Sequence, residues 1–296
     1  MSWKDASHRS AKSSILVSST AFCAALYAIS CYLTAFIVSP WGRGQFRPAV
    51  VVPATFAIAF GPLPAALGAA IGTFVADSIK HGGPYIPSLV AAVPGNFVGF
   101  YLFGRLVERK FDWKRFLVAS YFSLLVGNLI VAFLYVPTIY YLGFLPETLT
   151  ASDLLLFAFG LFIWFFITEY PFVLLILPPV IVSLVKAGKV MLSSPEREVD
   201  ISLKTAYDKA SIWLLIPGAC FVFIGIFLAS TPLGEPIVIA FEKGFSLKLG
   251  EELAKEFSKA TMVAIEVMFI VSGYAMALAG AIISIVGSRR KRNESS

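Results

Sequence analysis

Long apolar segments are the feature that most constrains what this chain can fold into. The first of them runs from Ile15 to Val38 without a charged residue, long enough for a helix to cross the ~30 Å hydrocarbon core of a bilayer. Similar segments follow along the whole chain. Only 14% of the residues are charged, whereas soluble domains average about 25%. The sequence therefore predicts an all-α integral membrane protein.

About eight transmembrane helices are expected. Between Arg47 and Asp77 the chain has no charge, and Gly61-Pro62 near the middle of this stretch indicates a turn. We expect two short helices there, of which the first would be only about 21 Å long and would need neighbours to cover it. The expected spans lie near residues 14–39, 47–61, 62–80, 86–106, 115–142, 153–186, 209–230 and 260–287.

The positions of the cations predict the orientation. Positive residues collect at the N-terminus, in residues 105–115 and in residues 289–292, and short cytoplasmic loops carry such an excess. Both termini are therefore expected in the cytoplasm of a multi-pass protein of the cell membrane. Since the N-terminus and residues 105–115 are expected on the same side, the chain must cross the membrane an even number of times between them. This again requires the hairpin. Residues 232–259 would lie outside and include a helix along the membrane surface.

Three polar residues stand inside the predicted spans, namely Asn96, Asn128 and Glu169. An ionisable group in lipid is costly, so Glu169 is predicted to be functional. For the two asparagines, two interpretations stay open: hydrogen bonds between helices, or the lining of a ligand cavity. Tyr85 and Tyr135 lie on the same helical stripes as these residues.

The first outer loops supply a second group of candidates. Trp41, Arg43, Gln45 and Arg47 lie close together in the first loop, and Lys80 and His81 begin the second. Their cations would favour an anionic ligand. Two simpler explanations compete, because aromatic residues are common at membrane interfaces and because Arg47 could pair with Asp77.

Small residues four apart form a third pattern in the first span. Ala21 and Ala25 make one such pair, and Ala24 and Ala28 make another. This spacing lets helices approach closely. From spacing alone, packing within the protein is the usual explanation, and docking of a partner is the less common one.

Signatures of other functions are absent from the sequence. It has no HExxH, GxSxG or phosphate-binding glycine loop, so no enzyme activity, metal or cofactor is expected. Cys23, Cys31 and Cys220 all lie in apolar segments and are interpreted as packing residues. Because the cations gather at the ends of the spans, the net charge of +6 does not indicate nucleic-acid binding.

Several motifs in the first 190 residues resemble the S-component of an energy-coupling factor (ECF) transporter. They are the opening span with its alanines, FRPAVVVP at 46–53, FGPLPAALG at 60–68 with Asp77 after it, and VPGNFVG at 93–99. The resemblance implies a six-helix unit that binds a vitamin-like solute near the outer side, under the first outer loop. It also implies two kinds of partner, a separate membrane scaffold and two ATPase subunits. The scaffold would dock on the face formed by Ala21, Ala24, Ala25 and Ala28.

The chain departs from this family after the sixth span. We expect a six-helix substrate-binding unit at 1–190, a cytoplasmic linker at 191–208, and a two-helix membrane extension with a basic tail at 209–296. The extension could stabilise the fold, cover the docking face or recruit another partner. These possibilities remain open at this point.

Together these features predict a membrane-embedded substrate-binding subunit for uptake of a small organic micronutrient. Two alternatives are a standalone proton-coupled transporter using Glu169 or Asp77, and, less favoured, an intramembrane enzyme using Glu169. The predicted substrate-binding residues are Trp41, Arg43, Gln45, Arg47, Tyr85, Asn96, Asn128, Tyr135, Trp164 and Glu169.

Overall fold

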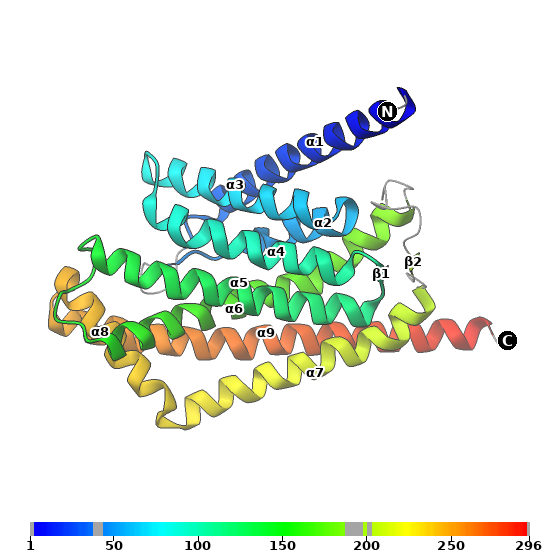
Figure 1. Ribbon diagram of the computed structural model, residues 1–296. Coiled ribbons are helices and arrows are strands. Elements are labelled where there is room, and N and C mark those ends of the chain that lie inside the picture. The colour runs from blue at the N-terminus through cyan, green and yellow to red at the C-terminus, as the bar shows by residue number, and fades with distance from the viewer. Residues whose placement is uncertain (1–2, 38–43, 187–197, 200–202, 295–296) are drawn as a thin grey trace.

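The computed structural model describes residues 3–37, 44–186, 198–199 and 203–294 and consists almost entirely of helices (Figure 1). Short helical turns at Pro48–Val50, Ser88–Ala92 and Pro232–Gly234 precede α2, α4 and α8. The helices are α1 (Trp3–Thr34), α2 (Val51–Phe60), α3 (Pro62–His81), α4 (Val93–Val107), α5 (Trp113–Tyr141), α6 (Ala151–Lys186), α7 (Leu203–Ser230), α8 (Glu235–Leu249) and α9 (Glu251–Glu294).

The membrane-spanning character of the fold is confirmed. Seven helices of the described residues are long and apolar enough to cross a bilayer, and Pro48–Phe60 is a shorter apolar helix. The remaining one of the eight expected spans, near residues 47–61, is therefore this short helix. The last helix is longer than its predicted span of 260–287 because its flanks are rich in glutamate, lysine and arginine, which favour a helix although they are polar.

The predicted hairpin is present at Gly61. This residue joins α2 to α3 with φ +95° and ψ −178°, a conformation that favours glycine, and its N–H donates to the carbonyl of Ala57 at 3.1 Å. On the other side of the turn, a Cβ on Gly104 of α4 would meet the backbone of Pro62. The turn is thus held against α4 by a close backbone approach.

The long helices run side by side, and both termini lie at the same end of the bundle (Figure 1). That end also holds the two-residue strands β1 (Lys110–Phe111) and β2 (Glu198–Val199), which pair in parallel. They join the α4–α5 connection to the predicted linker. The opposite end holds the α3–α4 and α5–α6 connections and α8.

Helix α1 packs on α3 through small residues. A Cβ on Gly68 would meet Cys23, and one on Gly72 would meet the carbonyl oxygen of Ala24. Ala24 and Ala28 are buried in this contact, with 9% and 8% of their surface exposed. These two alanines therefore contact α3, and their part in docking a partner stays a prediction. Ala21 and Ala25, on the other stripe, remain exposed.

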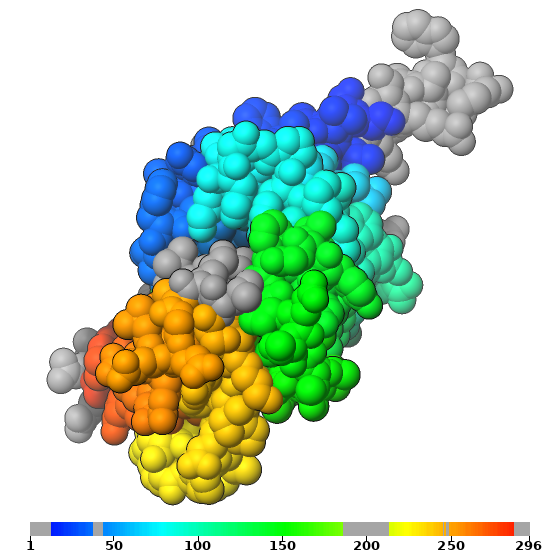
Figure 2. All heavy atoms as spheres, turned by 90° about the vertical axis from the view of Figure 1, so that its left-hand side faces the viewer, coloured from blue at the N-terminus to red at the C-terminus, as the bar shows by residue number. Residues whose placement is uncertain are grey.

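Of the C-terminal helices, α8 and α9 pack against α6, and α7 packs mainly on α9. Lys243 of α8 forms an ion pair with Asp153 of α6 at 2.9 Å, and the rings of Phe157 and Phe241 meet edge to face with centroids 5.0 Å apart. Figures 1 and 2 place these helices on the side of the bundle opposite α1. They leave the exposed alanines of α1 uncovered.

Candidate functional site

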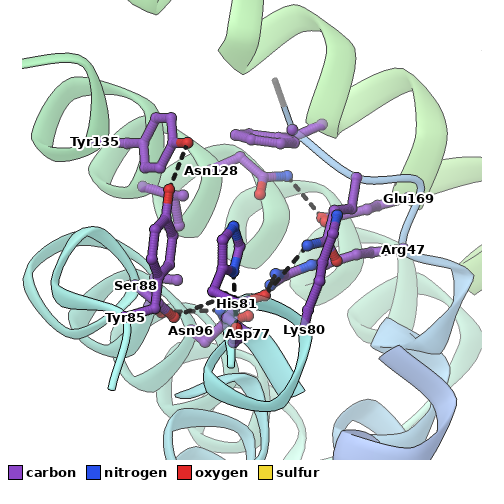
Figure 3. A pocket seen from close by; sticks show the side chains of 15 residues that line it. Arg47, Asp77, Lys80, His81, Tyr85, Ser88, Asn96, Asn128, Tyr135 and Glu169 are labelled. Atoms are coloured by element: carbon purple, nitrogen blue, oxygen red, sulfur yellow. Dashed lines mark hydrogen bonds and ion pairs between the residues drawn. The ribbon is translucent and has the colours of Figure 1, made fainter. Parts of the chain in front are cut away.

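A polar cavity of about 110 Å³ lies between α3, α4, α5 and α6, near the end of the bundle opposite the termini (Figure 3). Its wall combines charged, amide, hydroxyl and aromatic side chains with a few small or apolar residues. The lining residues are Gly44, Gln45, Arg47, Asp77, Lys80, His81, Tyr85, Ser88, Ala92, Asn96, Asn128, Val131, Tyr135, Phe165 and Glu169.

Most of the residues predicted to bind substrate come together here. The seven that line the cavity are Gln45, Arg47, Tyr85, Asn96, Asn128, Tyr135 and Glu169. Trp164 is not among the lining residues; it is 5% exposed and belongs to the hydrophobic core. The next residue, Phe165, faces the cavity instead. Trp41 and Arg43 lie outside the described residues.

Asp77 of α3 is the centre of a hydrogen-bonded cluster on one side of the cavity. Its Oδ1 accepts from Arg47 Nη2 at 2.6 Å and its Oδ2 accepts from Ser88 Oγ at 2.6 Å. Gln45 Nε2 also donates to Oδ1, at 3.4 Å, while Arg47 Nη1 donates to Thr73 Oγ1 at 2.6 Å. The proposed pairing of Arg47 with Asp77 is therefore confirmed.

This pairing changes the electrostatic character expected of the site. The Arg47 side chain is 12% exposed and the Asp77 side chain 6%, so their charges largely compensate each other away from water. Lys80 Nζ donates to the carbonyl of Ala35 near the end of α1, at 2.9 Å. Of the expected cations, Arg47 is thus neutralised by Asp77, whereas Lys80 keeps its charge and is held by a backbone carbonyl.

A second carboxylate, Glu169 of α6, also lines the cavity (Figure 3). Asn128 Nδ2 of α5 donates to Glu169 Oε2 at 2.8 Å, and both residues are buried. A carboxylate offers about four acceptor positions, and this bond uses one of them. Asn128 therefore satisfies both interpretations of the sequence, because it joins two helices and also lines the cavity.

Asn96 has the same double role. Its Nδ2 donates to the Ala92 carbonyl at 2.8 Å, and its Oδ1 accepts from the hydroxyl of Tyr27 at 3.3 Å. Tyr27 belongs to α1 and is fully buried. The cavity is thus linked by one side-chain hydrogen bond to the helix that carries the exposed alanines.

An aromatic wall completes the site. The rings of His81 and Tyr85 stack with centroids 3.7 Å apart and an interplanar angle of 2°. His81 Nδ1 is 2.8 Å from the carbonyl of Asp77, and the hydroxyls of Tyr85 and Tyr135 are 3.2 Å apart. Such a wall presents a flat apolar face bordered by hydroxyl groups, which suits a planar polar ligand.

Several lining residues were not among the predicted ones. Val131 and Phe165 lie three or four residues from Asn128 and Glu169, so helical periodicity could have found them. Ser88 follows Tyr85 by three residues but lies in a π-helical turn, where that periodicity fails. Gly44 has φ +78°, and a Cβ there would come within 2.8 Å of the Phe165 ring; no pattern in the sequence indicated this approach.

The comparison with known families agrees with this architecture. A family model described as "ECF-type riboflavin transporter, S component" matches residues 12–186, which include nearly all of α1 to α6 and every described residue of the cavity. No curated protein and no solved structure matches the chain. The matched region ends where α6 ends, so α7 to α9 lie beyond it. The chain belongs to the ECF-type riboflavin transporter S component family.

Proposed function

We propose that this protein is the membrane-embedded substrate-binding subunit of a vitamin uptake system and that its ligand is riboflavin. Separate subunits, a membrane scaffold and two ATPases, supply the energy. Both termini face the cytoplasm, so the cavity lies near the outer side. The observation that carries the proposal is the convergence of seven polar or aromatic residues, far apart in sequence, in one cavity of the region that matches the family.

The chemistry of the cavity suits riboflavin. This vitamin combines a flat tricyclic ring, whose edge carries hydrogen-bonding groups, with a chain of hydroxyls, and it has no net charge at neutral pH. Tyr85 and His81 offer a face for stacking. Glu169 and Asn128 supply acceptors and donors for hydroxyls. Because Asp77 neutralises Arg47, this cation favours a neutral ligand over an anionic one.

Binding requires the cavity to widen. Its volume of about 110 Å³ is below the roughly 300–1,000 Å³ of pockets that hold larger organic ligands. The longest hydrogen bonds that join two lining residues are Gln45–Asp77 at 3.4 Å and Tyr85–Tyr135 at 3.2 Å. We infer that these contacts open when riboflavin enters, while the shorter Arg47–Asp77 and Asn128–Glu169 contacts keep the helices in register.

Docking on the scaffold uses the exposed face of α1. Ala21 and Ala25 lie on this face beside Phe22 and Leu26, whose side chains are 65% and 48% exposed. Small residues there permit a partner helix to approach closely. The position of α7 to α9 on the opposite side of the bundle (Figure 2) supports this assignment, because they do not compete for the same face.

The proposal is tested by titrating the purified protein with riboflavin and following the quenching of flavin fluorescence, without ATP or partner subunits. We expect saturable binding of one riboflavin per chain. The phosphorylated analogue FMN should bind more weakly, because Asp77 already neutralises Arg47 and the charge of Glu169 would repel the phosphate. Absence of saturable riboflavin binding, with binding of a different vitamin, would overturn the substrate assignment.

A further inference from the structure

A second cavity, of about 410 Å³, lies where the C-terminal helices meet the rest of the bundle. Residues of α5, α6, α7 and α9 line it, among them Trp113, Phe116, Leu174, Pro178, Trp213 and Ile283. It shares no residue with the polar cavity and is almost wholly apolar. This apolar cavity lies toward the end that carries the termini, because Trp113 begins α5 and Leu174 follows Glu169 along α6.

The junction between α6 and the C-terminal helices is closed by direct contacts at two other levels. Near α8, the Asp153–Lys243 ion pair and the Phe157–Phe241 contact join the two parts. In the middle of the bundle, the ring of Phe221 lies 5.9 Å from that of Tyr170. Beyond these contacts the helices leave the apolar cavity between them, and the exposed lining residues Pro179 and Ser183 mark where it reaches the surface.

The surroundings of this cavity determine what can fill it. All four helices contribute residues from their membrane-spanning parts, so the medium outside the opening is lipid. Water needs two to four polar partners to occupy a cavity, which this lining does not offer. An empty space of this size would forfeit the dispersion contacts of its walls. A hydrocarbon chain is the occupant that both the lining and the surroundings favour.

The end of the cavity near the membrane boundary has features that suit a lipid headgroup. Trp113 is the first residue of its membrane-spanning segment, and Trp213 of α7 lines the same cavity. The indole N–H of each is buried and has no hydrogen-bond partner among the described residues, although buried tryptophan N–H groups usually find one. Lys114, next to Trp113, is exposed and offers a positive charge at the same level.

We propose that this cavity binds one acyl chain of an anionic phospholipid, with the ester and phosphate oxygens of the headgroup at the level of Trp113, Trp213 and Lys114. The lipid completes the junction between the six-helix unit and the C-terminal helices at a level that the described residues leave open. The C-terminal helices thereby create a lipid site in addition to their contacts with α6. This inference is independent of the identity of the transported solute.

Native mass spectrometry of the full-length protein in a delipidating detergent tests the proposal. We expect the wild-type protein to keep one phospholipid, and the lipid-stripped protein to rebind phosphatidylglycerol at least tenfold more tightly than phosphatidylcholine. Ala279→Phe and Ile283→Trp fill the cavity and should each lower the retained lipid at least tenfold. Leu278→Phe and Ile282→Trp place the same bulk on neighbouring exposed residues and should leave it unchanged.

Three results would overturn the proposal. Loss of all phospholipid from the wild-type protein would show that no specific site exists, whatever the variants do. Equal retention by the filled variants and their controls would place the lipid elsewhere. A co-purifying apolar molecule other than a phospholipid would refute the assignment of the occupant. None of these results depends on whether riboflavin binds.

Discussion

Asn128 of α5 and Glu169 of α6 are joined by a hydrogen bond of 2.8 Å across the wall of the polar cavity. The two residues are 41 positions apart in the sequence, and both are buried. A carboxylate at this depth in a membrane protein requires a partner or a ligand. The bond gives Glu169 such a partner and leaves acceptor positions for a hydroxyl-bearing ligand.

Replacing Glu169 by glutamine should weaken riboflavin binding by about 10- to 100-fold. A hydrogen bond to a charged group contributes roughly 1.5–3 kcal/mol, and 1.4 kcal/mol corresponds to a factor of ten in affinity. Fluorescence titration measures the change. Glu266→Gln on α9 is the matched control, since Glu266 does not line the cavity and its replacement should leave affinity unchanged. Equal affinities of the wild type and both variants would show that Glu169 does not contribute to riboflavin binding.

The Arg47–Asp77 ion pair should behave as a buried pair. Arg47→Met or Asp77→Asn leaves one charge without its partner in a site where the two side chains are 12% and 6% exposed. Each change should lower the free energy of unfolding by roughly 3–5 kcal/mol, measured by titration with a denaturing detergent in bicelles. The double variant Arg47→Met, Asp77→Leu should recover part of this loss, because no unpaired charge remains.

The exposed ion pair Arg105–Glu108 provides the control for that experiment. Its side chains are 53% and 33% exposed, so Arg105→Met should change the free energy of unfolding by at most about 1 kcal/mol. Equal effects at Arg47 and Arg105 would contradict the buried character of the first pair.

Bulky residues at Ala21 and Ala25 should separate binding from transport. The double variant Ala21→Trp, Ala25→Trp alters only exposed positions of α1, so riboflavin affinity should stay within twofold of wild type. Uptake into cells that contain the scaffold and ATPases should be abolished, because a partner helix could no longer approach. The control is Ala219→Trp, Ala229→Trp on exposed positions of α7, which should transport normally. Normal uptake by the α1 variant would refute the docking face.

Gly104→Ala should destabilise the hairpin of α2 and α3. A Cβ at this position would meet the backbone of Pro62. A backbone atom, unlike the end of a side chain, cannot relieve the clash by a change of rotamer. Overpacking of this kind costs about 1–3 kcal/mol, seen as a lower midpoint of thermal unfolding. Gly83→Ala has open space around its Cβ and should be close to neutral. If both variants unfolded at the same temperature as wild type, the close approach at Pro62 would be in error.

Much of the fold could be predicted from local features. The lengths of the apolar segments define the helices because an isolated backbone polar group cannot be left unsatisfied in lipid. Gly61-Pro62 marked the α2–α3 turn because few residues other than glycine adopt φ +95°. Asn96, Asn128 and Glu169 could also be identified from the sequence, because polar side chains are rare in apolar segments.

The choice among equivalent faces could not be predicted in this way. Trp164 and Phe165 differ by one helical step of about 100°, and only the packing of α6 decides that Phe165 faces the cavity. Likewise, two alanine stripes of identical spacing occur on α1, and contact with Gly68 and Gly72 of α3 covers one of them. The partners of Asp77 come from two segments far apart in the sequence, the loop with Gln45 and Arg47 and the turn with Ser88, which no local pattern connects.

The sequence by itself determined that this is a helical membrane protein with a hairpin at Gly61-Pro62 and a set of polar residues within its spans. Only the tertiary structure decided which of those residues share a cavity, which alanines of α1 stay exposed, and where α7 to α9 pack. The physical reason is that apolar residues that face lipid and those that face another helix are alike in composition. The difference between them arises from the fit of one helix against another, which becomes visible only when the helices are assembled.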